Sequence, residues 1–191
     1  MDITSALYSG FLGAISMFVF MELITLSKLA NADMIRAVGS LITKTEEHSF
    51  KVGMVLHLLA GLGFALLYCY ILSFIGTSEV AVFIGVGAFG GFVHGLLVSY
   101  FILTEGQNRH PLKKYQNAGF EVALAHVVGH VIYGAVIGYT FAYQILAETA
   151  GAAAAFSGWN TYQIYMTVIG TLALLTLVAL SIKNSFGRWN H

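Results

Sequence analysis

The chain has 191 residues, of which 58% are hydrophobic and only 9% are charged. A soluble domain carries roughly 25% charged residues, so composition excludes an ordinary soluble protein, and it also excludes a disordered chain. The zero net charge argues against nucleic-acid binding, and one cysteine, Cys69, excludes a disulfide framework. A polytopic helical membrane protein is the class that remains.

Five stretches are long and apolar enough to cross a bilayer, whose core of about 30 Å needs roughly 20 helical residues. In chain order they cover residues 5–28, 52–75, 80–103, 118–147 and 162–182. The only proline, Pro111, lies outside all of them, so each helix can run unbroken. The sequence therefore predicts an all-α integral membrane protein, a bundle of five transmembrane helices forming one domain over residues 1–191.

A short amphipathic helix is predicted after the first span, at residues 31–43. Apolar residues recur there at helical spacing, opposite a second set of residues that are polar or small. The apolar set is Met34, Ile35, Val38, Leu41 and Ile42, and the opposite set is Arg36, Gly39 and Ser40. We expect this helix to lie flat at the inner membrane interface, and a plain connecting helix is the alternative.

All basic residues fall on one side of the predicted bundle. The side with the N-terminus and the links at 76–79 and 148–159 has no Lys or Arg. The other side carries Lys28, Arg36, Lys44, Lys51, Arg109, Lys113, Lys114, Lys183 and Arg188. The positive-inside rule makes this second side cytoplasmic, with the N-terminus outside and the C-terminus inside. We expect the protein to lie in a bacterial inner membrane.

Ionisable residues inside a bilayer are costly, and they point to function. Five of them lie deep within the predicted spans, namely Glu22, His57, His94, His126 and His130, and Glu121 lies close to the end of one. At a helix rise of about 1.5 Å per residue, all five lie roughly 8–18 Å from the inner surface. They come from four helices, so only packing of the bundle brings them together. The other histidines, His48, His110 and His191, are expected to be solvated.

Imidazole and carboxylate groups together suit iron, zinc, manganese or copper better than magnesium or calcium. The sequence therefore predicts a transition-metal site whose ligands come from Glu22, His57, His94, His126 and His130. Glu121 and Tyr133 are expected to hydrogen-bond to these ligands. The alternative cofactor is haem b, held by His57 with His126 or His130, or by His94 with one of those two.

Three functions follow from these alternatives. A metal site predicts redox chemistry or metal handling, and haem predicts an electron-transfer or membrane-anchor subunit. Without a cofactor, the chain is an accessory subunit of a larger membrane complex, and its histidines hydrogen-bond between helices. The expected partners are the lipid bilayer and either further copies of the chain or other membrane subunits. No Gly-x-Ser-x-Gly or His-Glu-x-x-His motif occurs, so no reaction or substrate is predicted.

Three segments carry a resemblance to a known family. They are Ala32–Ser40 (ADMIRAVGS), Gly91–Gly95 (GFVHG) and Ala125–Gly134 (AHVVGHVIYG). Together they resemble a family of short polytopic bacterial membrane proteins that is classed as a domain of unknown function. The resemblance covers roughly the first four spans. It implies a helical membrane fold, and it implies no activity.

Overall fold

The computed structural model describes residues 2–77, 79–116 and 118–150, and this part of the chain is helical without any strand. Four helices in it are long and apolar enough to cross a membrane. They are α1 (Ile3–Leu26), α3 (Ser49–Leu72), α4 (Val80–Phe101) and α6 (Phe120–Ala150). Their ends lie within three residues of the first four predicted spans. The fifth predicted span, residues 162–182, lies outside the described residues.

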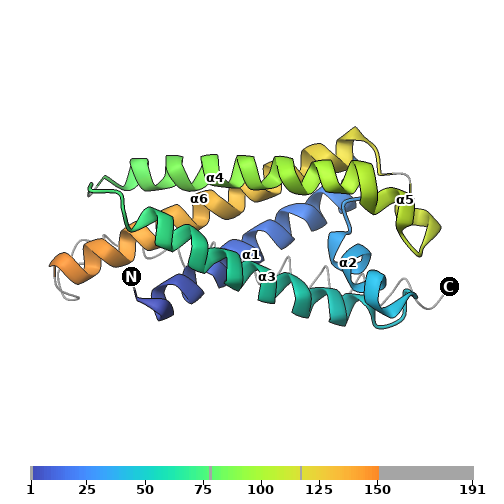
Figure 1. Ribbon diagram of the computed structural model, residues 1–191, viewed down its shortest axis with the longest axis horizontal. Coiled ribbons are helices and arrows are strands. Elements are labelled where there is room, and N and C mark those ends of the chain that lie inside the picture. Colours follow the sequence, from blue (N-terminus) through green and yellow to red (C-terminus); the bar gives the residue numbers. More distant parts are fainter. Residues whose placement is uncertain (1, 78, 117, 151–191) are drawn as a thin grey trace. The chain divides into compact units, whose positions relative to one another are not determined.

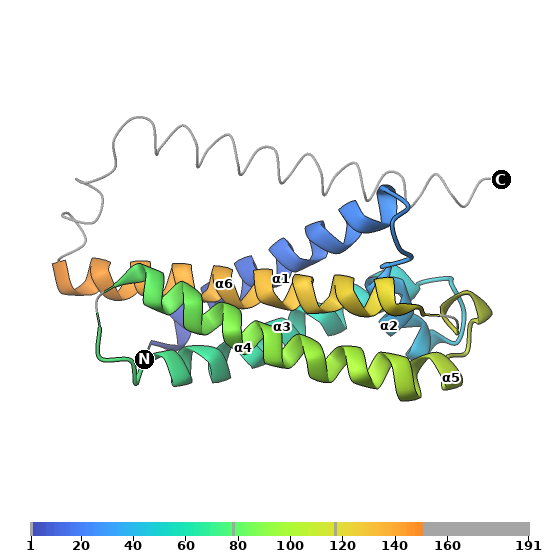
Figure 2. The same cartoon turned by 90° about the horizontal axis from the view of Figure 1, so that it is seen from above.

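Residues Met1–Gln144 form one compact unit, in which the long helices run back and forth. The short helices α2 (Met34–Thr43) and α5 (Gln107–Arg109) lie at one end of this unit, as Figures 1 and 2 show. The N-terminus and the link between α3 and α4 lie at the opposite end (Figure 1). The basic residues that flank the long helices of this unit therefore gather at the end that holds α2 and α5.

Local hydrogen bonds explain where the first helices begin. The Asp2 carboxylate accepts hydrogen bonds from the backbone N–H groups of Thr4 at 3.3 Å and Ser5 at 2.9 Å, which caps α1. The bonds from the backbone N–H and then the hydroxyl of Ser5 hold the pKa of this carboxyl below its ordinary value. Asp33 caps α2 in the same way, by accepting from the N–H of Arg36 at 3.3 Å.

Glycines let α4 and α6 pack backbone against backbone. A Cβ atom added at Gly91 would fall on the carbonyl oxygen of His130, and one at Gly87 would fall on that of Gly134. A contact this close requires a residue without a side chain on at least one of the two helices. The glycines near His94 and His130 therefore serve helix packing, and they set the two histidines beside each other.

Helix α2 buries residues that the apolar pattern did not single out. The helix forms as predicted, but its small and polar residues Arg36, Gly39 and Ser40 are buried. Of the apolar set, Met34 and Ile35 are also buried, while Val38, Leu41 and Ile42 are 40%, 40% and 60% exposed. The helix thus does not rest on one apolar face.

The cause of this burial is a close contact with α3. A Cβ at Gly39 would fall on the carbonyl oxygen of Ser49, so the two backbones touch there. The charge of Arg36 is tolerated because its guanidinium pairs with Asp33 at 3.0 Å and lies 5.0 Å from the ring centroid of Phe50. The pattern of apolar residues alone could not predict this arrangement.

Candidate functional site

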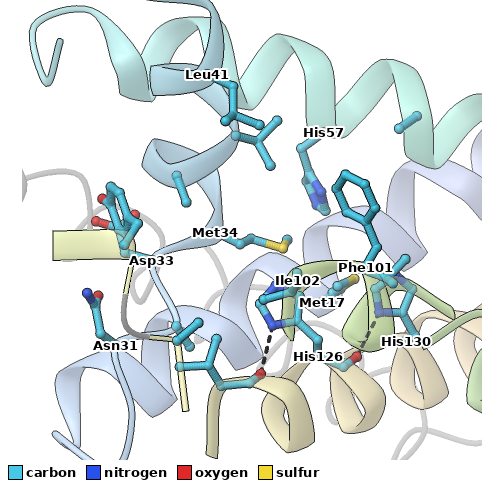
Figure 3. Close-up of a pocket in the computed structure, with 18 of the residues that line it drawn as sticks. Met17, Asn31, Asp33, Met34, Leu41, His57, Phe101, Ile102, His126 and His130 are labelled. Atoms are coloured by element: carbon cyan, nitrogen blue, oxygen red, sulfur yellow. Dashed lines mark hydrogen bonds between the residues drawn. The ribbon is translucent and has the colours of Figure 1, made fainter. Parts of the chain in front are cut away.

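A pocket of about 340 Å³ lies among α1, α2, α3, α4 and α6. Its wall is mostly apolar, and Met17 of α1, Met34 of α2, Phe64 of α3 and Phe101 of α4 all contribute to it. Residues of α2 and of the segment at 110–118 line it as well, so the pocket lies toward the end of the unit that holds α2 (Figure 3). Sequence reasoning did not identify these apolar wall residues, because their types occur all along the chain.

All four histidines of the long helices line this pocket: His57 from α3, His94 from α4, and His126 and His130 from α6. Figure 3 shows His57 extending from α3 and the rings of His126 and His130 rising from α6 toward the same cavity. His126 and His130 are four residues apart and share one face of α6. The helical bundle therefore gathers these imidazoles around one space.

Three of the four rings are held by backbone carbonyl groups. The Nδ1 atom of His126 donates to the carbonyl oxygen of Val122 at 2.8 Å, and that of His130 donates to the oxygen of His126 at 2.7 Å. The Nε2 atom of His57 donates to the carbonyl oxygen of Ala14 at 2.9 Å, which links α3 to α1. A carbonyl oxygen only accepts, so each of these nitrogens carries the hydrogen.

His94 is held by ring contacts instead. Its ring centroid lies 4.5 Å from that of His130 and 4.2 Å from that of Phe64. Its Nδ1 atom is buried without a hydrogen-bond partner within the described part of the chain. A buried polar atom of this kind usually has a partner, so this position at the pocket wall is open to a ligand or a water molecule.

The hydroxyl of Tyr133, which was expected to support a metal ligand, joins α6 to α3. It donates to the carbonyl oxygen of Gly61 at 2.5 Å, and the ring lines the pocket with only 3% of the residue exposed. The residue therefore fixes the pocket wall between these two helices.

The two carboxylates of the predicted site lie elsewhere. Glu22 is buried but is not part of the pocket wall, and Glu121 is exposed in the first turn of α6. Glu22 follows the wall residue Met17 by five positions, and Glu121 precedes His126 by five. At 3.6 residues per turn, five positions correspond to a rotation of about 140° away from the pocket. The structure thus gathers the histidines without the carboxylates.

The separation of the histidines from the two carboxylates leaves the predicted set of metal ligands incomplete. Within the described residues, no three His, Cys, Asp or Glu side chains are grouped so that they hold a metal ion. His57, His126 and His130 nevertheless each have one ring nitrogen that does not bond to the backbone in the interactions above. The wall as it stands combines a large apolar surface with a few polar ring atoms, which is the usual composition of a small-molecule site.

His110 was expected to be solvated, and it is buried, with 6% of the residue exposed. Its Nε2 atom donates to the carbonyl oxygen of Ala37 in α2 at 3.0 Å, and its Nδ1 atom accepts from the N–H of Leu112 at 3.1 Å. The ring therefore fastens the segment after α5 onto α2, where both line the pocket. The only local signal was the adjacent Pro111, which does not reveal this long-range contact. His48 is exposed as expected, and His191 lies outside the described residues.

Comparison with known proteins adds no assignment, since no family model, curated protein or solved structure matches the chain. The resemblance carried by the three sequence segments stays a prediction. The function of the pocket must therefore be inferred from its own geometry and chemistry.

Proposed function

We propose that this protein is an integral membrane protein that binds a lipid-soluble small molecule in the histidine-lined pocket. The observation that carries this proposal is that all four in-span histidines line one mostly apolar cavity of about 340 Å³. Ligand sites have volumes of roughly 300–1,000 Å³, an apolar wall and a few oriented polar groups. Four imidazoles inside a bilayer are costly, and a shared ligand is a physical reason to keep them together.

The position of the pocket supports entry from the bilayer. Phe64 of α3 and Phe101 of α4 both line the pocket, and they are 42% and 57% exposed on the surface of the bundle. α3 contacts α4 much less extensively than it contacts α1 or α2. A side opening between α3 and α4 would admit a molecule dissolved in the membrane, and this supports a lipid-soluble ligand over an aqueous one.

The same proposal includes an orientation. We place the end with α2 and α5 in the cytoplasm and the N-terminus outside, because the basic residues flanking the long helices are concentrated at the first of these ends. A bacterial inner membrane is the location that we propose. The pocket then lies in the cytoplasmic half of the bilayer. Single cysteines introduced at either end of the bundle and labelled from outside in intact cells test this orientation. Equal labelling of both ends would reject it.

Filling the pocket tests the binding function. Ala60 lines the pocket, whereas the neighbouring Leu59 is 62% exposed and does not. We expect Ala60→Phe to weaken saturable binding of an apolar environment-sensitive fluorescent probe at least tenfold in lipid nanodiscs. Leu59→Phe is the matched control on the same helix, and it should bind as the wild type does. Equal binding by Ala60→Phe and wild type, with both proteins folded, would reject the pocket as the site.

A metal or haem iron is the second candidate, and one observation favours it. The rings of His94 and His130 come from facing helices with their centroids 4.5 Å apart, and the His130 ring is oriented by a backbone bond as metal-ligating histidines are. This separation suits two neighbouring ligands of one metal ion better than two ligands on opposite sides of a haem. Iron, zinc, manganese or copper is the expected metal. Metal content per chain, measured on untagged protein, and an optical spectrum test this. Folded protein with far less than one metal per chain and no haem absorption would exclude it.

A further inference from the structure

The hydrogen bonds of the pocket histidines determine which chemistry they offer to a ligand. His126 and His130 donate from Nδ1 to backbone carbonyl groups, and His57 donates from Nε2 to that of Ala14. In a neutral imidazole the nitrogen without hydrogen is an acceptor. The remaining atoms, Nε2 of His126 and His130 and Nδ1 of His57, are therefore acceptors.

Three of the polar donors in the pocket wall are already engaged. The Tyr133 hydroxyl donates to the Gly61 carbonyl at 2.5 Å, and Nε2 of His110 donates to that of Ala37 at 3.0 Å. The Lys114 ammonium pairs with the carboxylate of Glu46. The wall thus offers mainly acceptors, and a ligand that brings its own hydrogen-bond donors is complementary to it.

The two acceptors on α6 also lie on the same face of the helix. His126 and His130 are four residues apart on one face, and the Cβ atoms of such pairs are roughly 5–6 Å apart. A benzene ring that carries two hydroxyl groups can therefore approach both imidazoles from this face. Phe64, Phe101 and Tyr133 line the same pocket and provide aromatic surface for such a ring.

We infer that the ligand of this pocket is a lipid-soluble aromatic alcohol, of the hydroquinone or phenol class, whose hydroxyl groups donate to Nε2 of His126 and His130. The inference rests on the proposed binding function and specifies its ligand. A hydroquinone with an alkyl tail meets each requirement: it dissolves in the bilayer, has a flat aromatic ring and carries two donors. The corresponding quinone has nearly the same size but no hydroxyl donor, and the dimethyl ether lacks the donors while adding two methyl groups.

The test compares two probes on the full chain in lipid nanodiscs: an alkylated hydroquinone kept reduced, and its dimethyl ether. We expect the hydroquinone to bind at least tenfold more tightly. His126→Leu and His130→Leu should remove this preference, while the exposed His48→Leu should keep it. Equal affinities for both probes would overturn the donor inference and leave the pocket proposal intact. Absence of saturable binding for the hydroquinone and its ether would overturn the ligand inference. Absence of binding for the fluorescent probe as well would overturn the pocket proposal.

A second measurement avoids variants that disturb the fold. In protein labelled with ¹⁵N at histidine, we expect the Nε2 atoms of His126 and His130 to give signals of nitrogen without hydrogen. The hydroquinone should shift these signals, because it donates to them, and the dimethyl ether should not. Nε2 atoms that already carry hydrogen in the ligand-free protein would overturn the inference.

Discussion

Adding one methyl group at Gly91 tests whether the backbone contact between α4 and α6 builds the pocket. The new Cβ would fall on the carbonyl oxygen of His130, and because this is a backbone atom no side-chain rotation relieves the clash. Overpacking of this kind costs about 1–3 kcal/mol, and alanine regains at most about 1 kcal/mol of helix propensity. We expect Gly91→Ala to lower the free energy of unfolding by about 2 kcal/mol. The overpacking cost lies at the upper end of its range because backbone must move, and the gain in helix propensity offsets part of it.

Gly85, on the same helix, provides a matched control, because a Cβ atom added there meets no other atom within 4 Å. Gly85→Ala should leave stability unchanged or raise it by up to about 1 kcal/mol. Both variants are compared by circular dichroism during reversible unfolding in mixed micelles with increasing dodecyl sulfate. Gly91→Ala should also weaken probe binding, since it separates His94 from His130. The reasoning fails if Gly91→Ala is as stable as Gly85→Ala.

Two further substitutions test single contacts in the same unfolding assay. Tyr133→Phe removes the hydroxyl bound to Gly61, and we expect the free energy of unfolding to fall by about 1 kcal/mol, within the range for interhelical hydrogen bonds in membranes. The control Tyr139→Phe, at an exposed position, should be neutral. Equal effects of the two substitutions would contradict the assignment of this hydrogen bond. Asp33→Asn keeps a capping side chain but removes the charge paired with Arg36, whose side chain is only 8% exposed. We expect a loss on the order of 3 kcal/mol, since the guanidinium stays buried, and wild-type stability would show that this pair contributes nothing.

Hydropathy predicted the long helices well, because a bilayer imposes both their length and their composition. It did not predict the contacts of α2 with α3, where small and polar residues are buried. Gly39 and Gly53 decide the arrangement instead, since each allows the backbone of one helix to touch the other. Such a pairing of glycines joins positions on different helices, and no local pattern identifies the partner.

The histidine cluster could be predicted in part. Depth along each helix indicated which side chains can meet, and His57, His94, His126 and His130 do line one pocket. Depth does not determine rotation about the helix axis, however, and rotation is what keeps Glu22 out of the pocket wall. The contact of His110 with Ala37 joins residues 73 positions apart, which explains why sequence reasoning placed this ring in solvent.

The most direct test of the central claim is to map where a ligand binds. Membranes containing the protein are treated with a photoreactive alkylated hydroquinone, and labelled peptides are sequenced by mass spectrometry. The account predicts labels at pocket residues such as Phe64, Phe101 and Val122, which excess unlabelled hydroquinone removes. Labels confined to exposed residues outside the pocket wall, such as Leu59 and Phe89, and insensitive to competition would contradict it.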